Sequence, residues 1–245
     1  MVAIGGDGTV NRFLNALMDF EYNCRLFVFQ CGSGNDLARE FEKQKMFEIT
    51  NMAHMLPHAV LNGEKKMVFV NGIGMGFDAV VNKTYQHAKM KGRTRRGTYL
   101  WCMMRSFVKH KSTGVKIWVD DKLIYNNLIF SIAIGVGKYN GGGMQQLPSA
   151  IADDGLLDIT LIKPIHWWHV LFRLRRLYNG TIYSIGHVLH AQGSKIRIES
   201  SPETPLEVDG EALGATPVEF RVLHRDVRVV VNKSFLKKLR KQSKL

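Results

Sequence analysis

The chain has 245 residues, of which 45% are hydrophobic, so it can bury a sizeable core in one large domain or two small ones. No apolar run approaches the ~20 residues that a membrane-spanning helix needs, which excludes a helical integral membrane protein. The three cysteines form no CxxC pair, and the histidines lack partners at zinc-binding spacing, so no disulfide scaffold or zinc module is expected. The net charge of +13 favours a polyanionic partner: nucleic acid, an anionic membrane or a phosphorylated substrate.

A glycine-rich stretch, residues 5–11, follows a short apolar run, and apolar residues then recur at helical spacing up to Met18. The pattern predicts a strand, a tight turn and a helix. Glycine lets the backbone approach a ligand, and the first amides of a helix are free, so the turn suits a phosphate group. Asp7 would repel an anion unless Mg²⁺ lies between them. Alternatively, the turn has no ligand and Asp7 is a capping residue.

The same order of elements recurs directly afterwards. The apolar run at residues 26–29 is followed by a second glycine-rich turn, residues 31–36, and by a helix that begins near Leu37. Two such units place both turns at the carboxyl edge of a parallel sheet, where open α/β sheets bind ligands. We therefore predict that Asp7 and Asp36 lie beside one phosphate site.

The pattern changes after the turn at Asn62 and Gly63, which we predict to be a domain boundary. Before it, a helix is expected over residues 49–56, ending at Pro57. After it, residues 115–119 and 123–125 alternate around an Asp-Asp turn, which predicts a hairpin. Further strands are expected at residues 67–70, 128–136, 156–162, 195–198, 218–222 and 227–231. The fold class is then an α/β domain with a parallel sheet, residues 1–63, followed by an antiparallel β-sandwich, residues 64–232.

Two helices, at residues 89–111 and 167–178, are predicted to interrupt the strands. Both combine basic and aromatic residues, for example Trp101 with Arg96 and Trp168 with Arg175. This combination is typical of a surface that contacts an anionic membrane. The alternative is an amphipathic helix that covers the sheet and leaves its arginines in solvent.

Five blocks occur in one order along the chain, and together they resemble the diacylglycerol kinase catalytic family, which includes bacterial lipid kinases and sphingosine kinases. The blocks are GGDGTVN from residue 5, CGSGNDLAR from residue 31, NGIGMGFDA from residue 71, GGGMQQLPSAIADDGLLD from residue 141 and LEVDGE from residue 206. The first block alone would also fit NAD kinase or phosphofructokinase, but the second and fifth argue against both.

The resemblance implies a kinase that moves the γ-phosphoryl group of ATP to a lipid hydroxyl, such as that of diacylglycerol, with Mg²⁺ as the metal ion. It implies a site between the two domains and a C-terminal helix, residues 233–245, that packs back on the first domain. Glu211 would accept the hydroxyl proton, with Asp7 and Asp209 in the same catalytic set. Asp78 would orient the acceptor hydroxyl, although it could equally cap a loop.

The resemblance also implies the ligands of the nucleotide and of a structural Mg²⁺ ion. The nucleotide-binding residues would be Gly5, Gly6, Asp7, Gly8, Thr9, Val10, Asn11, Gly32, Ser33, Gly34, Asn35 and Asp36. The side chain of Asp154 and the carbonyl groups of Ile151 and Leu156 would hold the structural ion.

The chain departs from the family pattern at its start, because relatives have another strand-and-helix stretch before the first block. We therefore expect a truncated nucleotide-binding domain, and the alternative function is a catalytically silent homologue that binds lipid or nucleotide. The expected partners are a lipid substrate and an anionic membrane, contacted peripherally, with no nucleic acid; a homodimer is left open. The cysteine pattern fits a cytoplasmic protein. The lipid kinase activity that the resemblance implies would place it at the inner face of the membrane.

Overall fold

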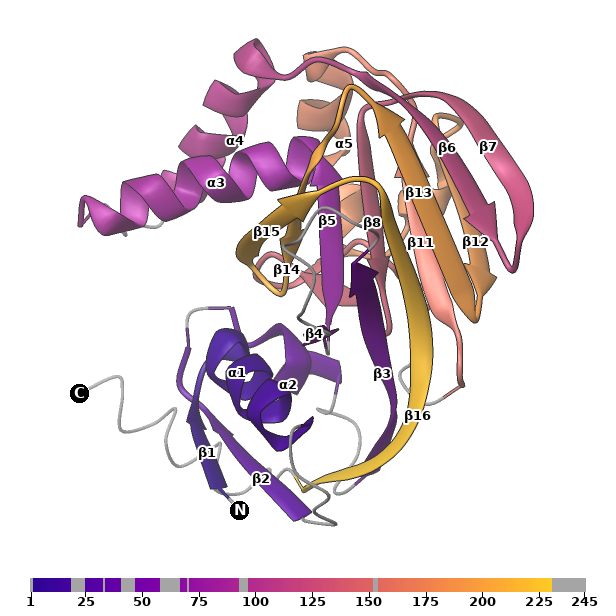
Figure 1. The fold of residues 1–245 in the computed structure, drawn as a ribbon. Helices are drawn as coiled ribbons and strands as arrows, with labels where there is room; N and C mark the ends of the chain where they lie inside the picture. The colour runs from indigo at the N-terminus through magenta and orange to yellow at the C-terminus, as the bar shows by residue number, and fades with distance from the viewer. Residues whose placement is uncertain are drawn as a thin grey trace.

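The structure, a computed structural model, describes residues 2–18, 25–32, 34–40, 47–57, 67–69, 71–92, 97–151 and 154–230. In this part of the chain the strands form an eight-stranded sheet, a six-stranded sheet and a short hairpin (Figure 1). The same part of the chain contains no helix that is both long and apolar enough to cross a membrane.

The helices are α1 (Asp7–Met18), α2 (Asp36–Glu40), α3 (Phe77–Met90), α4 (Thr98–Lys109), α5 (Trp167–Tyr178) and the 3₁₀ turn η1 (Ile182–Ser184). The eight-stranded sheet contains β1 (Val2–Gly5), β2 (Arg25–Gln30), β3 (Phe47–Pro57), β4 (Met67–Phe69), β6 (Thr113–Val119), β7 (Lys122–Ile129), β13 (Lys195–Ser201) and β16 (Val218–Val230). The six-stranded sheet contains β5 (Gly72–Gly76), β8 (Ser131–Gly135), β11 (Leu157–Ile162), β12 (Val188–Gly193), β14 (Pro205–Val208) and β15 (Glu211–Ala215). The hairpin is β9 (Tyr139–Asn140) with β10 (Met144–Gln145).

The N-terminal unit has the predicted order of strand, glycine-rich turn and helix, twice. Strands β1 and β2 pair in parallel, with Gly5 opposite Gln30 at their carboxyl ends. Helix α1 buries Val10 and Leu14 completely, as its helical spacing of apolar residues predicts. Because the two strands are parallel and end together, both glycine-rich turns leave the sheet at the same edge.

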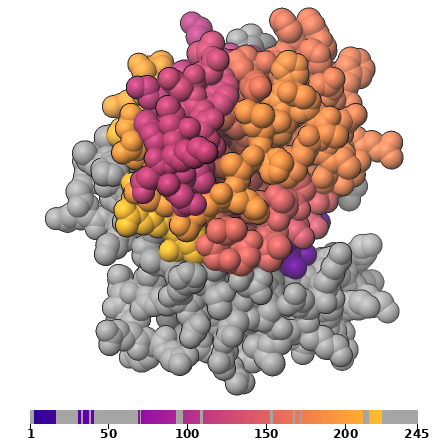
Figure 2. Space-filling view, turned by 90° about the vertical axis from the view of Figure 1, so that its right-hand side faces the viewer, coloured from indigo at the N-terminus to yellow at the C-terminus, as the bar shows by residue number. Residues whose placement is uncertain are grey.

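The predicted β-sandwich is confirmed by a hydrophobic core that lies between the two large sheets. In β6, Val115, Ile117 and Val119 are buried and alternate with more exposed residues. Strands β5 and β8 are instead buried at every position, because α3, α4 and α5 cover the outer face of their sheet (Figure 1). Figure 2 shows the opposite edge of the sandwich, where the residues of β6 and β7 lie beside those of β12 and β13.

One strand joins the two parts of the molecule. Strand β16 pairs with β13 in the sandwich and continues next to β2 in the N-terminal unit (Figure 1). It also pairs with β3 from Phe47 to Pro57, so the prediction of a helix over residues 49–56 is wrong. Apolar residues in this segment recur at two-residue spacing, which suits a strand, as well as at helical spacing. The pairing with a distant strand selects the strand over the helix.

Other elements differ from the predictions in extent. The helix expected over residues 89–111 is instead the end of α3 and the separate helix α4, and most of α3 was not predicted. The strands expected at residues 218–222 and 227–231 are the single strand β16. Six strands were not predicted: β5, β9, β10, β12, β14 and β15. The boundary turn at residues 62–63 and the C-terminal helix lie outside the described residues.

Replacing Phe220 by Ala should test the sandwich core. Phe220 is fully buried and its ring meets that of Phe69 edge to face, with centroids 6.2 Å apart. Removing a buried aromatic ring leaves a cavity, so the free energy of unfolding in urea should fall by about 3–5 kcal/mol. The control Phe172→Ala, at a side chain that is 82% exposed, should change it by less than about 0.5 kcal/mol. Equal losses in the two variants would contradict the assigned core.

Candidate active site

The two glycine-rich turns of the N-terminal unit lie against each other. A side chain on Gly32 would collide with the Cα atom of Gly6, and one on Gly5 would collide with Thr9. The close approach is possible only because these positions carry no side chain. At this edge the protein therefore presents backbone groups, next to the amino end of α1.

Asp7 connects the first turn to the second. Its carboxylate accepts the backbone N–H groups of Asp36 and Leu37, at 3.0 and 3.1 Å. An anion at the start of a helix satisfies free amides and interacts favourably with the helix dipole, so Asp7 stabilises α2. The capping role considered for Asp7 is therefore present, but toward the helix of the neighbouring unit.

Asp36 connects the N-terminal unit to the sandwich. It is 5% exposed, and its carboxylate accepts the N–H groups of Gly142 and Gly143 at 2.7 and 2.6 Å. Residues 141–143 have φ values of 70°, 87° and 95°, a conformation that favours glycine. Burial raises the pKa of the Asp36 carboxyl and the charge of Asp7 raises it further, while the two glycine amides lower it.

Asp209 forms a second connection between the same parts. Its carboxylate accepts the N–H groups of Asn71 and Gly72, both at 3.1 Å, and the side-chain amide of Asn11 at 2.6 Å. Asn11 belongs to α1, whereas Asn71 and Gly72 lead into β5. The turn that carries Asp209 is thereby attached to both the sandwich and the first helix.

Two amides of α3 hold the rest of this turn, and sequence reasoning missed them. Asn82 and Gln86 donate hydrogen bonds to the carbonyl oxygen of Gly210, at 2.7 and 2.9 Å. Together with Asp78 they recur every four residues on one face of the helix, which is the signal that could have found them. They fix the backbone that leads into Glu211, which pairs with Val208 at the start of β15; the Glu211 side chain lies outside the described part.

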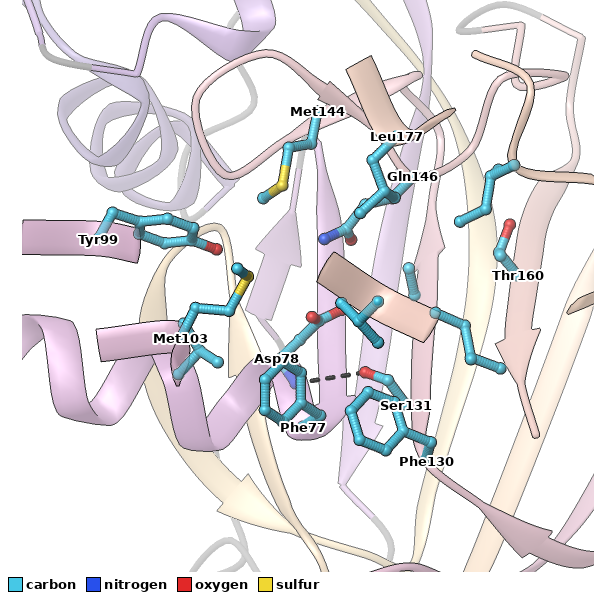
Figure 3. A pocket seen from close by; sticks show the side chains of 15 residues that line it. Phe77, Asp78, Tyr99, Met103, Phe130, Ser131, Met144, Gln146, Thr160 and Leu177 are labelled. Atoms are coloured by element: carbon cyan, nitrogen blue, oxygen red, sulfur yellow. Dashed lines mark hydrogen bonds between the residues drawn. The ribbon is translucent and has the colours of Figure 1, made fainter. Parts of the chain in front are cut away.

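An apolar pocket lies beside this junction (Figure 3). Helices α3, α4 and α5 and the outer face of the six-stranded sheet enclose a cavity of about 50 Å³ within a wider space of about 560 Å³ that is partly open to solvent. Figure 3 shows the Asp78 carboxylate and the Gln146 amide directed toward each other among apolar side chains. Burial raises the pKa of Asp78 to about 6. A mostly apolar pocket with few polar groups suits a ligand with a long apolar part and a small polar end.

Tyr99 contacts both the pocket and the glycine loop that Asp36 binds. It lines the pocket from α4, and its hydroxyl group is close to the loop at Gly141. The pKa of Tyr99 is raised well above its ordinary value by burial first, and then by the charges of several acids that include Asp78 and Asp36. The side chain therefore stands between the acid of the pocket and the acid that binds the glycine loop.

The residues predicted to hold a structural Mg²⁺ ion lie within one turn of the chain. The amide of Asp154 donates to the carbonyl of Ile151 at 3.3 Å, and the Asp154 carboxylate accepts the N–H of Leu156 at 2.9 Å. Among the described residues, no group of three or more His, Cys, Asp or Glu side chains is arranged to hold a metal ion. These ligands stay a prediction, and Ser33 of the second turn lies outside the described residues.

Comparison with known protein families accounts for most of the chain. Residues 71–231 match the YegS C-terminal NAD kinase beta sandwich-like domain, and residues 1–68 match the diacylglycerol kinase catalytic domain. The chain belongs to the diacylglycerol kinase catalytic-domain family. This confirms the resemblance that the five sequence blocks indicated.

Individual relatives agree with the family. The diacylglycerol kinase of Bacillus subtilis is 25% identical over 242 residues, which cover 95% of this chain and 78% of that protein. A protein of Pseudomonas syringae named "Probable lipid kinase YegS-like" is 28% identical over 227 residues, which cover 90% of this chain and 72% of that protein. The crystal structure of a diacylglycerol kinase from Bacillus anthracis has a TM-score of 0.65 at 20% identity, and the match covers 95% of this chain and 76% of that one, which shows the shared fold. The chain is thus lipid kinase-like.

Replacing Asp209 by Ala should show how much this acid contributes to joining the two parts. The variant leaves two backbone amides and the Asn11 side chain without their acceptor, so the free energy of unfolding should fall by about 3 kcal/mol. Asp121→Ala is a matched control, because Asp121 also has a left-handed backbone, with φ 64°, but its side chain is 78% exposed and accepts a hydrogen bond from the ammonium group of Lys195. Urea unfolding should show a clearly smaller loss in the control; losses of the same size would contradict the role of Asp209.

Proposed function

We propose that this protein is an ATP-dependent lipid kinase that transfers the γ-phosphoryl group of ATP to the hydroxyl group of a lipid such as diacylglycerol. The observation that carries the proposal is the position of the apolar pocket. It lies next to the contact between the N-terminal unit and the sandwich. There the carboxylates of Asp7, Asp36 and Asp209 accept hydrogen bonds beside the two glycine-rich turns. A lipid chain and a nucleotide triphosphate would thus meet at adjacent places.

The glycine-rich turns and the amino end of α1 are suited to the triphosphate, because they offer backbone N–H groups and no side-chain bulk. Asp7 and Asp36 would hold Mg²⁺ there. The oxygen-only donor set fits this ion, which needs one or two carboxylates besides phosphate oxygens and water. A carboxylate has about four lone-pair sites, so the bonds that each acid makes to backbone amides leave room for a metal ligand. When bound, the ion would neutralise charge on the transferred group.

The acceptor would bind with its apolar chains in the pocket and its hydroxyl group at Asp78. Phosphoryl transfer depends mainly on positioning and on charge neutralisation, so holding this oxygen in line with the γ-phosphorus is the main task. Glu211 would take the hydroxyl proton as phosphate transfer proceeds. Asn82 and Gln86 would position Glu211 through the carbonyl group of Gly210.

Transfer of labelled phosphate from ATP to short-chain diacylglycerol in mixed micelles should be observed, and it should require Mg²⁺. Glu211→Gln should lower kcat about 10²–10⁴-fold, because the general base is lost. Asp78→Asn should mainly raise the KM for the lipid. The control Glu199→Gln removes an exposed acid of β13 and should leave both constants unchanged. Lipid binding by the wild type without any phosphate transfer would favour the catalytically silent homologue.

We further propose that the helices that enclose the pocket contact an anionic membrane. Helix α5 lines the pocket with Val170 and Leu177 while it exposes Trp168 and Phe172. Helix α4 likewise lines the pocket and exposes Trp101, whose ring lies 5.5 Å from the guanidinium of Arg105. Exposed aromatic residues beside arginines suit the interface of a bilayer that carries negative charge. A lipid could then enter the pocket directly from the membrane.

Phe172→Glu should test this surface. It replaces an exposed apolar side chain by an acid, so binding to vesicles that contain anionic phospholipid should weaken about tenfold in a sedimentation assay. Leu123→Glu is the control, because Leu123 is 47% exposed on β7, at the far edge of the sandwich. Added salt should weaken binding of the wild type. Equal effects of the two substitutions would argue against the α5 surface.

A further inference from the structure

A second carboxyl group lies behind Asp78, and the function proposed above makes no use of it. Glu207 in β14 is 6% exposed and pairs across the sheet with Gly74 of β5. A side-chain carbon added to Gly74 would lie 2.6 Å from the Glu207 Oε1 atom and 2.9 Å from the Cβ atom of Asp78. The two acids therefore border one small space, which exists because residue 74 is glycine.

Carboxamide groups connect the two acids. Asn82 donates to the Oε2 atom of Glu207 at 2.7 Å, and the Nδ2 atom of Asn140 lies 3.5 Å from its Oε1 atom. The same Nδ2 atom is 3.3 Å from the Oε1 atom of Gln146, which in turn hydrogen-bonds Asp78. Glu207 does not line the pocket itself, but through Asn140 it is connected to Gln146 and so to the polar end of the pocket.

No positive side chain balances these acids among the described residues that line the pocket. The titratable groups that face Glu207 in the described part are all acidic. They are Asp78 from α3, Tyr99 from α4 and Asp209 from the turn between β14 and β15, and β5 contributes none. Burial raises the pKa of Glu207 to about 8, with the charge of Asp78 as the next cause, while hydrogen bonds from the Asn140 side chain and the Gly210 backbone act in the opposite direction. Two like charges in one buried site are costly, so near neutral pH the pair retains one proton.

We propose that Glu207 is a positioning residue of the acceptor site that holds the single proton of the Asp78–Glu207 pair. Asp78 then stays ionised and accepts the hydrogen bond of an uncharged acceptor hydroxyl. Loss of the proton from Glu207 places a second negative charge beside Asp78 and disturbs this arrangement, so acceptor binding weakens in alkaline solution. The inference rests on the lipid kinase function proposed above.

Glu207→Gln tests the role, because glutamine keeps the shape of the protonated acid and has no proton to lose. The KM for short-chain diacylglycerol should be measured between about pH 6.5 and about pH 9.5 at saturating MgATP. In the wild type it should rise about tenfold per pH unit above about pH 8, with a smaller change in kcat. In Glu207→Gln the KM near neutral pH should stay within about twofold of the wild type and should not rise.

Glu199→Gln is the matched control, since it removes one exposed acid of β13 and should keep the alkaline rise of the wild type. All other titrating groups are common to the three proteins, so the comparison isolates Glu207. An alkaline rise in KM of the same size in Glu207→Gln would overturn the proposal. A loss of kcat in Glu207→Gln at every pH would overturn it as well.

Thermal unfolding gives a readout that does not depend on activity. Folding raises the pKa of Glu207 from 4.5 to about 8, so the folded protein binds this proton more tightly than the unfolded chain does. The resulting stability is fully present below about pH 4.5 and is lost as the pH rises to about 8. The difference between the Tm of Glu207→Gln and the Tm of the wild type should therefore increase from about pH 4.5 to about pH 8 and then stay constant.

The two readouts separate the possible failures. A Tm difference that is independent of pH would contradict the acid pair itself, whether or not the enzyme is active. Absence of phosphate transfer to any lipid, combined with the expected Tm difference, would leave the acid pair intact and overturn its role in the acceptor site together with the proposed function.

Discussion

The structure depends on carboxylates that bind backbone amides from a distant part of the chain. Asp36 holds the glycine loop of the β9–β10 hairpin, and Asp209 binds the start of β5 and the Asn11 side chain of α1. Charge-assisted hydrogen bonds of this kind are among the stronger polar contacts in proteins. Strand β16 connects the two parts through strand pairing, with β13 on one side and β2 on the other. The carboxylates connect the glycine-rich turns to the sandwich and thereby set the orientation of these turns.

The distribution of charge supports the same account. The protein carries a net charge of +13, yet the described groups at the junction and behind the pocket are mainly acids. Among the residues whose exposure is described, no arginine or lysine is buried, and Arg175 of α5 is exposed. An acidic interior suits a cation bound with a triphosphate and an uncharged lipid head, whereas a basic exterior suits an anionic membrane. The two kinds of charge thus serve different parts of one proposed reaction.

Local patterns predicted much of this fold, and long-range pairing accounts for what they missed. The two strand–turn–helix units, the hairpin at Asp120 and Asp121 and the bounds of α5 follow from spacing and turn residues close in sequence. Strand β3 was mistaken for a helix because its partner, β16, lies far along the chain. Motifs identified Asp7, Asp36 and Asp78, but Glu207 gained meaning only when β14 placed it over Gly74. The amides of Asn82 and Gln86 likewise required the packing of α3 against the turn at Gly210.

The most direct measurement is a crystal structure of the protein with Mg²⁺, a non-hydrolysable ATP analogue and a short-chain diacylglycerol. The account predicts that the triphosphate lies along residues 5–11 and that the lipid hydroxyl is held by Asp78, about 3–3.5 Å from the γ-phosphorus. A nucleotide bound away from the glycine-rich turns, or a lipid seated outside the pocket of α3, α4 and α5, would contradict it.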